Sequence, residues 1–187
     1  SAWETSIGDS MAPSPRRVWW TSALGSTDEG DDERVSNTSS VKSYTDVEEA
    51  VSGISPAAQG SNFIFSYNSQ WKLVSTSVPG APFVRYRMGE AKGCIEHKSI
   101  IIGEDEDGDP CIYWLSPQGP MRKGKNGDQS MYDDVADIWD TVNLSATKVA
   151  GHGVYHRDKH QIWWWVATGS SIDPDTMMVF DTRLGQS

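Results

Sequence analysis

Residues 153–167 read GVYHRDKHQIWWWVA, and this stretch indicates how the chain folds. Two runs rich in β-branched and aromatic residues flank the polar triplet 157–159, which is typical of a β-hairpin. The second run, which contains three consecutive tryptophans, does not alternate between apolar and polar residues. A strand that is apolar at successive positions is buried on both faces, as happens where sheets stack face to face. The stretch therefore predicts a hairpin within a stack of β-sheets.

The same pattern occurs twice upstream. Residues 62–67 and 70–76 flank a two-residue turn at 68–69, and residues 97–103 and 111–116 flank an acidic loop. The three hairpins have onsets near residues 62, 99 and 154, about 37 and 55 residues apart, close to the period of propeller blades. We therefore predict an all-β, propeller-like fold of stacked antiparallel hairpins, with a two-layer sandwich as the alternative. Closed propellers usually have four or more blades, so three hairpins predict an incomplete propeller, or one completed by the N-terminal third, another segment or a second subunit.

Helices are the minority element of this prediction. Residues 41–53 are predicted to form a short helix, with Thr45 as N-cap. A second helix is predicted over 130–142, capped by Ser130. Its apolar face repeats at helical spacing and consists of Met131, Val135, Ile138, Trp139 and Val142. A further strand is predicted at 177–181.

Length and composition set the domain organisation and exclude some functions. The 187 residues include nine Trp, six Tyr and four Phe, enough to build a core, and no apolar run approaches the length of a membrane span. The net charge of −10 argues against a surface that binds nucleic acid phosphates. We predict a turn-rich N-terminal segment with one short strand over 1–45 and a propeller-like β domain over 46–187. Because no initiator methionine or signal peptide opens the sequence, we expect it to be part of a longer chain.

Several motifs together resemble a known family. They are RVWWT at 17–21, GCIEHKSII at 93–101, IYWLSPQGP at 112–120, IW at 138–139, GVYH and IWWWV at 153–156 and 162–166, and MVFD at 178–181. Over about residues 17–185 the chain resembles propeller-like structural proteins of tailed bacteriophage virions, namely tail tubular or nozzle proteins and related head–tail proteins. In such proteins these motifs form propeller blades, and they carry no catalytic signature.

The resemblance implies a non-enzymatic component of the virion tail. Copies of the chain would form a homo-oligomeric ring around the DNA path, with neighbouring tail and connector proteins as partners and no cofactor. Genomic DNA would pass through the channel without sequence-specific binding, because an acidic wall repels phosphate. The alternatives are a carbohydrate-binding or glycan-cleaving, sialidase-like propeller, and an interaction propeller of secreted or cell-surface type.

The loop between the second pair of strands is a candidate metal site. Asp105, Asp107 and Asp109 occupy alternate positions, as the first three carboxylates of a calcium loop do. An EF-hand also requires Gly at the sixth position and Glu at the twelfth, where this chain has Pro110 and Ser116. We therefore interpret the loop as a solvated hairpin tip, with a weak surface Ca²⁺ site as the alternative.

Five tryptophans are candidates for packing or assembly. In a strand, Trp163 and Trp165 share one face and Trp164 points to the other. We interpret these three, together with Trp114 and Trp139, as residues that pack between sheets or at a subunit contact. An aromatic platform for sugars is the alternative.

Histidines and cysteines are weaker candidates. His152, His156 and His160 recur every four residues; in a hairpin, His156 and His160 are expected to face each other, which gives a weak case for a metal site. Cys94 and Cys111 lie in strand-like runs and are expected to be free and buried, with a disulfide across a hairpin as the alternative.

Catalytic signatures are missing from the sequence. It contains no nucleophile elbow, phosphate-binding glycine loop or dinucleotide-binding fingerprint. Arg85, Arg87 and Arg122 could supply the arginine triad that a sialidase-like function requires, but they lie in no recognisable motif. We interpret them as structural, and we predict no catalytic residues.

Overall fold

The computed structural model describes residues 16–21, 41–55, 61–76, 83–88 and 93–184. The chain divides into two compact units, residues 1–51 and residues 52–187. In the first unit, strands β1 (Arg17–Thr21) and β2 (Val41–Asp46) form an antiparallel pair in which Trp19 lies opposite Tyr44. Most of the predicted turn-rich segment 1–45 lies outside the described residues.

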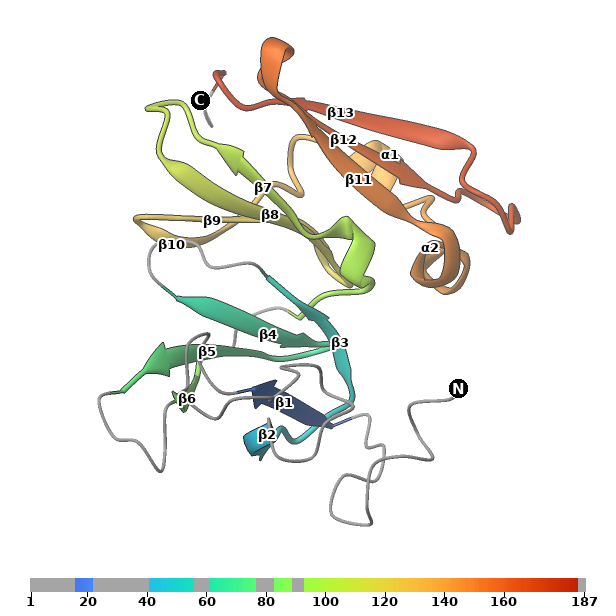
Figure 1. The fold of residues 1–187 in the computed structure, drawn as a ribbon. Coiled ribbons are helices and arrows are strands. Elements are labelled where there is room, and N and C mark those ends of the chain that lie inside the picture. The colour runs from blue at the N-terminus through green and yellow to red at the C-terminus, as the bar shows by residue number, and fades with distance from the viewer. Residues whose placement is uncertain (1–15, 22–40, 56–60, 77–82, 89–92, 185–187) are drawn as a thin grey trace, which may run out of the picture. The chain divides into compact units, whose positions relative to one another are not determined.

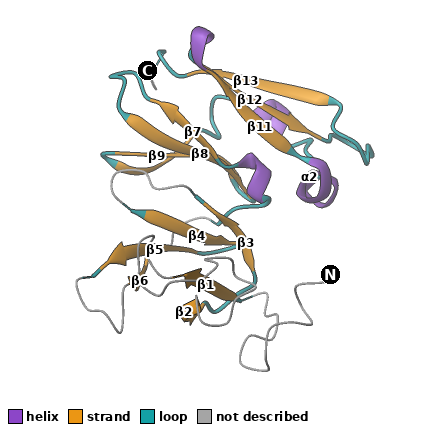
Figure 2. Cartoon of the chain, in the orientation of Figure 1, coloured by secondary structure: helices purple, strands orange, loops and turns teal. Residues whose placement is uncertain are grey.

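The second unit contains three antiparallel sheets, which we call the first, second and third sheets (Figures 1 and 2). In every sheet each strand pairs with its neighbours in the sequence. The first sheet consists of β3 (Val51–Ile54), β4 (Asn62–Ser66), β5 (Gln70–Ser75) and β6 (Phe83–Arg87). The second consists of β7 (Ile101–Glu104), β8 (Pro110–Ser116), β9 (Gly119–Gly124) and β10 (Gly127–Ser130). The third consists of β11 (His152–His156), β12 (Gln161–Val166) and β13 (Thr176–Asp181).

The second sheet is buried on both faces. Along β8, every residue from Cys111 to Ser116 is buried. Tyr113 points to one face and packs in a cluster with Trp164 of the third sheet. Trp114 points to the other and packs with Phe65 of the first sheet, their ring centroids 5.2 Å apart. A non-alternating apolar run in β8 therefore does correspond to a strand between two sheets.

Both central indoles also form hydrogen bonds, which a buried N–H requires. Trp114 Nε1 donates to the carbonyl of Gly93 at 2.9 Å. Trp164 Nε1 donates to the carbonyl of Ser99 at 3.0 Å. Each indole therefore fixes the chain segment that leads into the second sheet, residues 93–99, in addition to filling the core.

The structure confirms an all-β architecture with few helices, and it confirms the three predicted hairpins. The first turn lies one residue earlier than predicted, because Ser66 N–H donates to the Ser69 carbonyl and leaves 67–68 as the turn. Residues 97–99, predicted as strand, form a 3₁₀ turn. Strands β3, β6, β9 and β10 were not predicted. They are short, and β9 and β10 contain Gly and charged residues, which weaken a strand signal.

The helix predicted over 41–53 is wrong, because this segment forms β2 and β3. Val41, Tyr44 and Thr45 favour extended structure, and pairing with β1 outweighs the capping pattern that Thr45 begins. Helix propensity and capping patterns are weak predictors of structure where a neighbouring strand can form a ladder of hydrogen bonds with the segment.

The helix predicted over 130–142 is largely wrong as well. Ser130 ends β10, and its hydroxyl accepts the Tyr132 N–H at 3.2 Å instead of capping a helix. The helix is reduced to one turn, α1 (Ala136–Trp139), and a second helix, α2 (Leu144–Ala150), follows it. The predicted apolar face still lies in the core between the second and third sheets. The apolar spacing thus located buried residues in a segment that is mostly turn.

Candidate functional site

The third sheet has one covered face and one accessible face. Along β12, Ile162, Trp164 and Val166 are buried, whereas Trp163 and Trp165 are half-buried. This confirms that Trp164 points away from the other two tryptophans. The expectation that this run is buried on both faces is wrong for β12, because in the described part of the chain the second sheet covers only the face with Trp164.

We call the opposite side of this sheet the outer aromatic face. Its members follow from the strand register, in which residues opposite one another share a face. They are His152, Val154 and His156 on β11, Gln161, Trp163 and Trp165 on β12, and Met177, Val179 and Asp181 on β13. Three of them are large exposed hydrophobic side chains, with exposed fractions of 46% for Val154 and 45% for Met177 and Val179.

Side chains on and beside this face are held by ring contacts. The imidazole of His152 stacks on Trp165 with ring centroids 4.9 Å apart and an angle of 10° between the planes. His156 tilts against Trp163 at 5.0 Å, and Trp163 meets Trp165 edge-on at 6.1 Å. Lys159 Nζ lies 5.1 Å from the centre of the Trp163 ring. The indole rings of Trp163 and Trp165 therefore each have another side chain packed against them.

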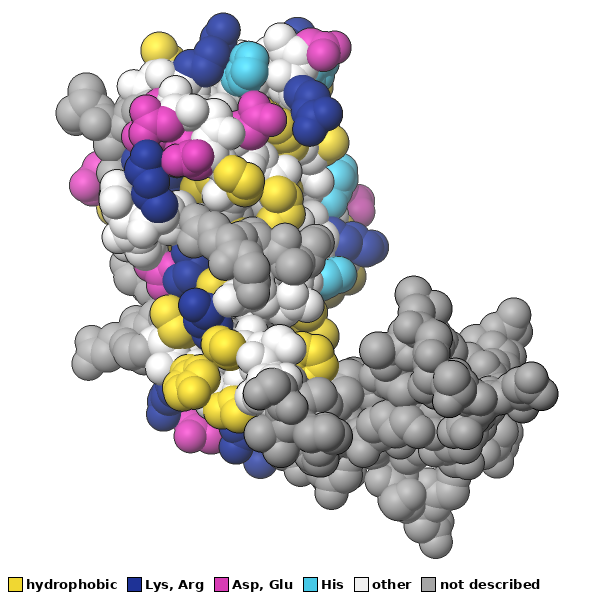
Figure 3. All heavy atoms as spheres, turned by 60° about the vertical axis from the view of Figure 1, so that its left-hand side comes forward, with side chains coloured by type: hydrophobic (Ala, Val, Ile, Leu, Met, Phe, Trp, Pro, Cys, Tyr) yellow, Lys and Arg dark blue, Asp and Glu magenta, His cyan; other side chains and the backbone are white. Residues whose placement is uncertain are grey.

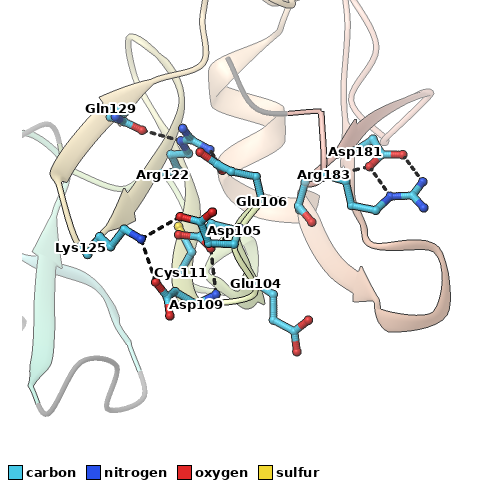
Figure 4. Close-up of polar contacts among 12 residues, drawn as sticks. Glu104, Asp105, Glu106, Asp109, Cys111, Arg122, Lys125, Gln129, Asp181 and Arg183 are labelled. Atoms are coloured by element: carbon cyan, nitrogen blue, oxygen red, sulfur yellow. Dashed lines mark hydrogen bonds and ion pairs between the residues drawn. The ribbon is translucent and has the colours of Figure 1, made fainter. Parts of the chain in front are cut away.

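The face carries little negative charge. Asp181 is its one acidic strand residue, and Arg183 binds it at 2.8 Å (Figure 4). The guanidinium of Arg183 and its hydrogen bonds lower the pKa of Asp181 to about 2. Lys159 adds a positive charge beside Trp163. The outer aromatic face is thus mostly apolar. The turns beside it carry charges of both signs, with Arg157, Asp158 and Lys159 at one end of the sheet and Asp173 and Asp175 at the other.

The other tryptophan candidates lie in the interior. Trp114, Trp139 and Trp164 are buried, with exposed fractions of 0%, 6% and 1%. Trp139 and Trp164 belong to the cluster between the second and third sheets, and Trp114 to the cluster between the first and second. These three residues pack the core, and only Trp163 and Trp165 reach the surface.

The three candidate calcium ligands do come together in the β7–β8 loop, and Figure 4 shows two of them, Asp105 and Asp109. One oxygen from each of Asp105, Asp107 and Asp109 lies within 4.8 Å of the others. Asp105 Oδ1 accepts the backbone N–H groups of Asp107 and Asp109, at 3.1 and 2.8 Å. Lys125 Nζ donates to the other two carboxylates at 2.7 and 3.1 Å. The ammonium group thus already supplies the cation that balances this loop, and it holds the pKa of Asp107 below its usual value.

Addition of Ca²⁺ is expected to leave the wild-type protein unchanged. To bind the loop, the ion must displace Lys125 Nζ from two carboxylates, and the remaining ligands are too few for a tight site. Isothermal titration with CaCl₂ should give no saturable heat, and the melting temperature should not move. The Lys125→Met variant is the matched comparison, since it leaves the three carboxylates in place. Saturable binding by the wild-type chain would contradict this account.

Arg122 is held by two side chains of its own sheet, away from the strand that carries Arg85 and Arg87. The Arg122 guanidinium is buried and donates to Gln129 Oε1 at 2.6 Å and to Glu106 Oε2 at 2.9 Å (Figure 4). Arg122 lies on β9 of the second sheet, whereas Arg85 and Arg87 lie on β6 of the first.

The two cysteines are free and buried, which excludes the disulfide alternative. Cys94 packs in the cluster with the first sheet and Cys111 in the cluster with the third. Burial raises the pKa of the Cys94 thiol to about 12 and that of Cys111 to about 11. Neither is a nucleophile at neutral pH, since the thiolate is the reactive form.

The histidines do not form a cluster. His156 lies opposite Gln161, so the expected pairing of His156 with His160 is wrong. His160 sits after the 3₁₀ turn with a φ of 54°, and its ring nitrogen lies 3.9 Å from the Glu104 carboxylate. In the described ranges, the aspartates of the β7–β8 loop are the one group of potential metal ligands.

No protein-family model matches the chain, and no curated protein shows significant similarity to it. Over the residues that the structure describes, no helix has the length and apolar character to cross a membrane. The third sheet has a mostly apolar, accessible face, and the second sheet carries a charge cluster that is balanced within the chain.

Proposed function

We propose that the chain is a non-enzymatic structural module of a tailed-bacteriophage virion. In this proposal its sheets form part of a propeller-like ring in the tail tube, nozzle or head–tail connection. The observation that carries the proposal is the stacking of consecutive antiparallel sheets, in which the second sheet is buried on both faces. Stacked sheets of this kind are the building units of propellers. The resemblance of the strand motifs to phage tail proteins supplies the virion assignment.

The partners in this proposal are other copies of the chain, neighbouring tail and connector proteins, and the DNA that passes through the channel. The net charge of −10 supports passage without retention, because phosphate is repelled by an acidic wall. The face turned forward in Figure 3 carries acidic and basic side chains interspersed.

The proposal is tested on the virion itself. Tailed particles purified by density gradient from a lysate of the host that carries the gene should contain this chain. Quantitative mass spectrometry should find it at a ring-like copy number, well below that of the major capsid protein. Absence of the chain from intact particles, with other tail proteins present, would overturn the virion assignment.

A carbohydrate-binding or glycan-cleaving propeller is a second candidate, favoured by the half-exposed Trp163 and Trp165. Sugars stack on free indole faces, but here His152 and Lys159 already lie over these rings. Glycan-array binding that is lost in Trp165→Ala, or hydrolysis abolished by a single Asp→Asn change, would place this candidate above the structural one.

A further inference from the structure

The turn between β9 and β10 contains an asparagine followed by a glycine. Lys125 and Asn126 form the turn, and Gly127 begins β10. Asn126 is exposed, and within the described part of the chain its side-chain amide forms no hydrogen bond. A glycine after asparagine leaves the backbone nitrogen open to attack the side-chain amide, because it has no Cβ to hinder the approach.

The other asparagines of the described residues are less suited to this reaction. Asn62 is followed by a phenylalanine, Asn68 by a serine and Asn143 by a leucine, so each next residue carries a Cβ. Asn143 is also held at both ends of its amide. Its Oδ1 accepts the Ala146 N–H at 3.2 Å, and its Nδ2 donates to the Ser171 carbonyl at 3.0 Å.

A second acyl group that precedes a glycine, at Asp107–Gly108, is protected by its charge. Lys125 Nζ donates to the Asp107 carboxylate at 2.7 Å, and its hydrogen bond and charge hold the pKa of that carboxyl below its usual value. An ionised carboxylate resists attack by a nucleophile. Asn126 carries a neutral amide instead, so it is the more reactive of the two.

The attacking nitrogen lies where the β9–β10 ladder ends. β10 has four residues and forms an edge of the second sheet. Gly127 pairs with Gly124 in the last pair before the turn, and ladder ends open before ladder centres. A Cβ atom built on Gly127 would meet no atom within 4 Å, so a small ring that includes its nitrogen has room to form. The nitrogen is protected in the closed pair and free to react when the pair opens.

We propose that Asn126 is a site of spontaneous deamidation. The Gly127 nitrogen loses its proton to solvent and attacks Cγ of Asn126. The N–Cγ bond forms, the Cγ–Nδ2 bond breaks, and Nδ2 takes up a proton from water and leaves as ammonia. A water molecule then opens the cyclic imide at either carbonyl, which gives aspartate or isoaspartate. Water is consumed, ammonia is released, and nothing is oxidised or reduced; the reaction needs no partner, so it does not depend on the proposed function.

The product changes both the charge and the backbone of this end of the second sheet. The new carboxylate lies next to Lys125, whose Nζ already binds Asp107 and Asp109, as Figure 4 shows for Asp109. Isoaspartate also lengthens the backbone of the turn by a methylene group, so the adjoining ladder loosens. We expect amide hydrogen exchange of residues 127–130 to become faster in the modified chain.

Peptide mapping by mass spectrometry tests the proposal on the wild-type chain, after ageing in heavy-oxygen water at physiological temperature. Asn126 should gain a heavy oxygen in its new carboxyl group at least about tenfold faster than Asn62, Asn68 or Asn143, because only Asn126 precedes a glycine. The rate should rise with pH, since the attacking nitrogen must lose its proton. A protein isoaspartate methyltransferase should label the same peptide.

Two variants make the test specific. Asn126→Gln should abolish the conversion, because the longer side chain closes a ring far more slowly. Asn68→Gln is the matched control, since Asn68 is likewise the second residue of a two-residue turn, and it should leave the conversion of Asn126 unchanged. Conversion of wild-type Asn126 no faster than that of Asn68 would overturn the proposal, as would heavy-oxygen uptake at position 126 that persists at the wild-type rate in Asn126→Gln.

Discussion

Replacing Gly93 with alanine is expected to destabilise the second unit strongly. A Cβ atom at this position would lie 2.0 Å from the Ser66 carbonyl oxygen and 2.4 Å from the carbonyl group of Tyr67. These are backbone atoms of the β4–β5 turn, so no side-chain rotation relieves the overlap. The turn and the segment are also joined by a hydrogen bond, from Cys94 N–H to the Ser66 carbonyl at 2.9 Å. Because the two cannot separate without losing this bond, we expect a loss of about 4 kcal/mol or more.

Urea denaturation, followed by circular dichroism, measures this loss. Gly124→Ala is the control, because the nearest atoms to a Cβ there are 3.7 Å away, in ordinary contact. The control should change the free energy of unfolding by no more than about 0.5 kcal/mol. A Gly93→Ala protein with a wild-type unfolding midpoint would contradict the close packing of residue 93 on the β4–β5 turn.

Replacing Trp114 with alanine is expected to lower the free energy of unfolding by about 3–5 kcal/mol. The side chain is fully buried between the first and second sheets. The substitution removes its packing against Phe65 and leaves a cavity, and it also leaves the Gly93 carbonyl without the indole N–H. An unsatisfied buried acceptor adds to the cost of the cavity.

Trp163→Ala is the matched control for Trp114→Ala, since both residues are tryptophans within a strand. Trp163 is only half-buried, so its removal should cost less than half as much. Equal losses for the two variants in urea denaturation would show that the core between the first and second sheets does not dominate stability.

The sequence predicted the parts of the fold that depend on strong apolar runs. Residues 112–115 and 162–166 are apolar in succession, and both form strands at the centre of the second unit. An apolar run does not show whether other sheets cover one face of the strand or both faces. The two runs look alike, yet β8 lies between two sheets and β12 is covered on one side. That difference depends on contacts between segments far apart in the sequence.

Short polar strands and short helices were missed for a local reason. β10, with the sequence GDQS, gains its structure from pairing with β9 and has no apolar pattern of its own. α2 begins at Leu144 after Asn143, whose side chain accepts the Ala146 N–H at 3.2 Å. Asn is a good N-cap, so this signal was present in the sequence, but no marked apolar face accompanies it.

The candidate site was only partly predictable. Alternation of side chains along a strand placed Trp163 and Trp165 on one face. The register that adds Val154 and Val179 to this face comes from strand pairing, which the sequence does not specify. The contact between Lys125 and the aspartate loop also depends on strand pairing. Lys125 follows β9, and the pairing of β9 with β8 brings it to the loop.

Electron microscopy of the concentrated wild-type protein tests the central claim, that the chain is a structural module that assembles through its sheets. The account predicts class averages of closed rings with a central channel. Single, separate particles of monomer size under the same conditions, with no rings or head-to-tail assemblies, would contradict it.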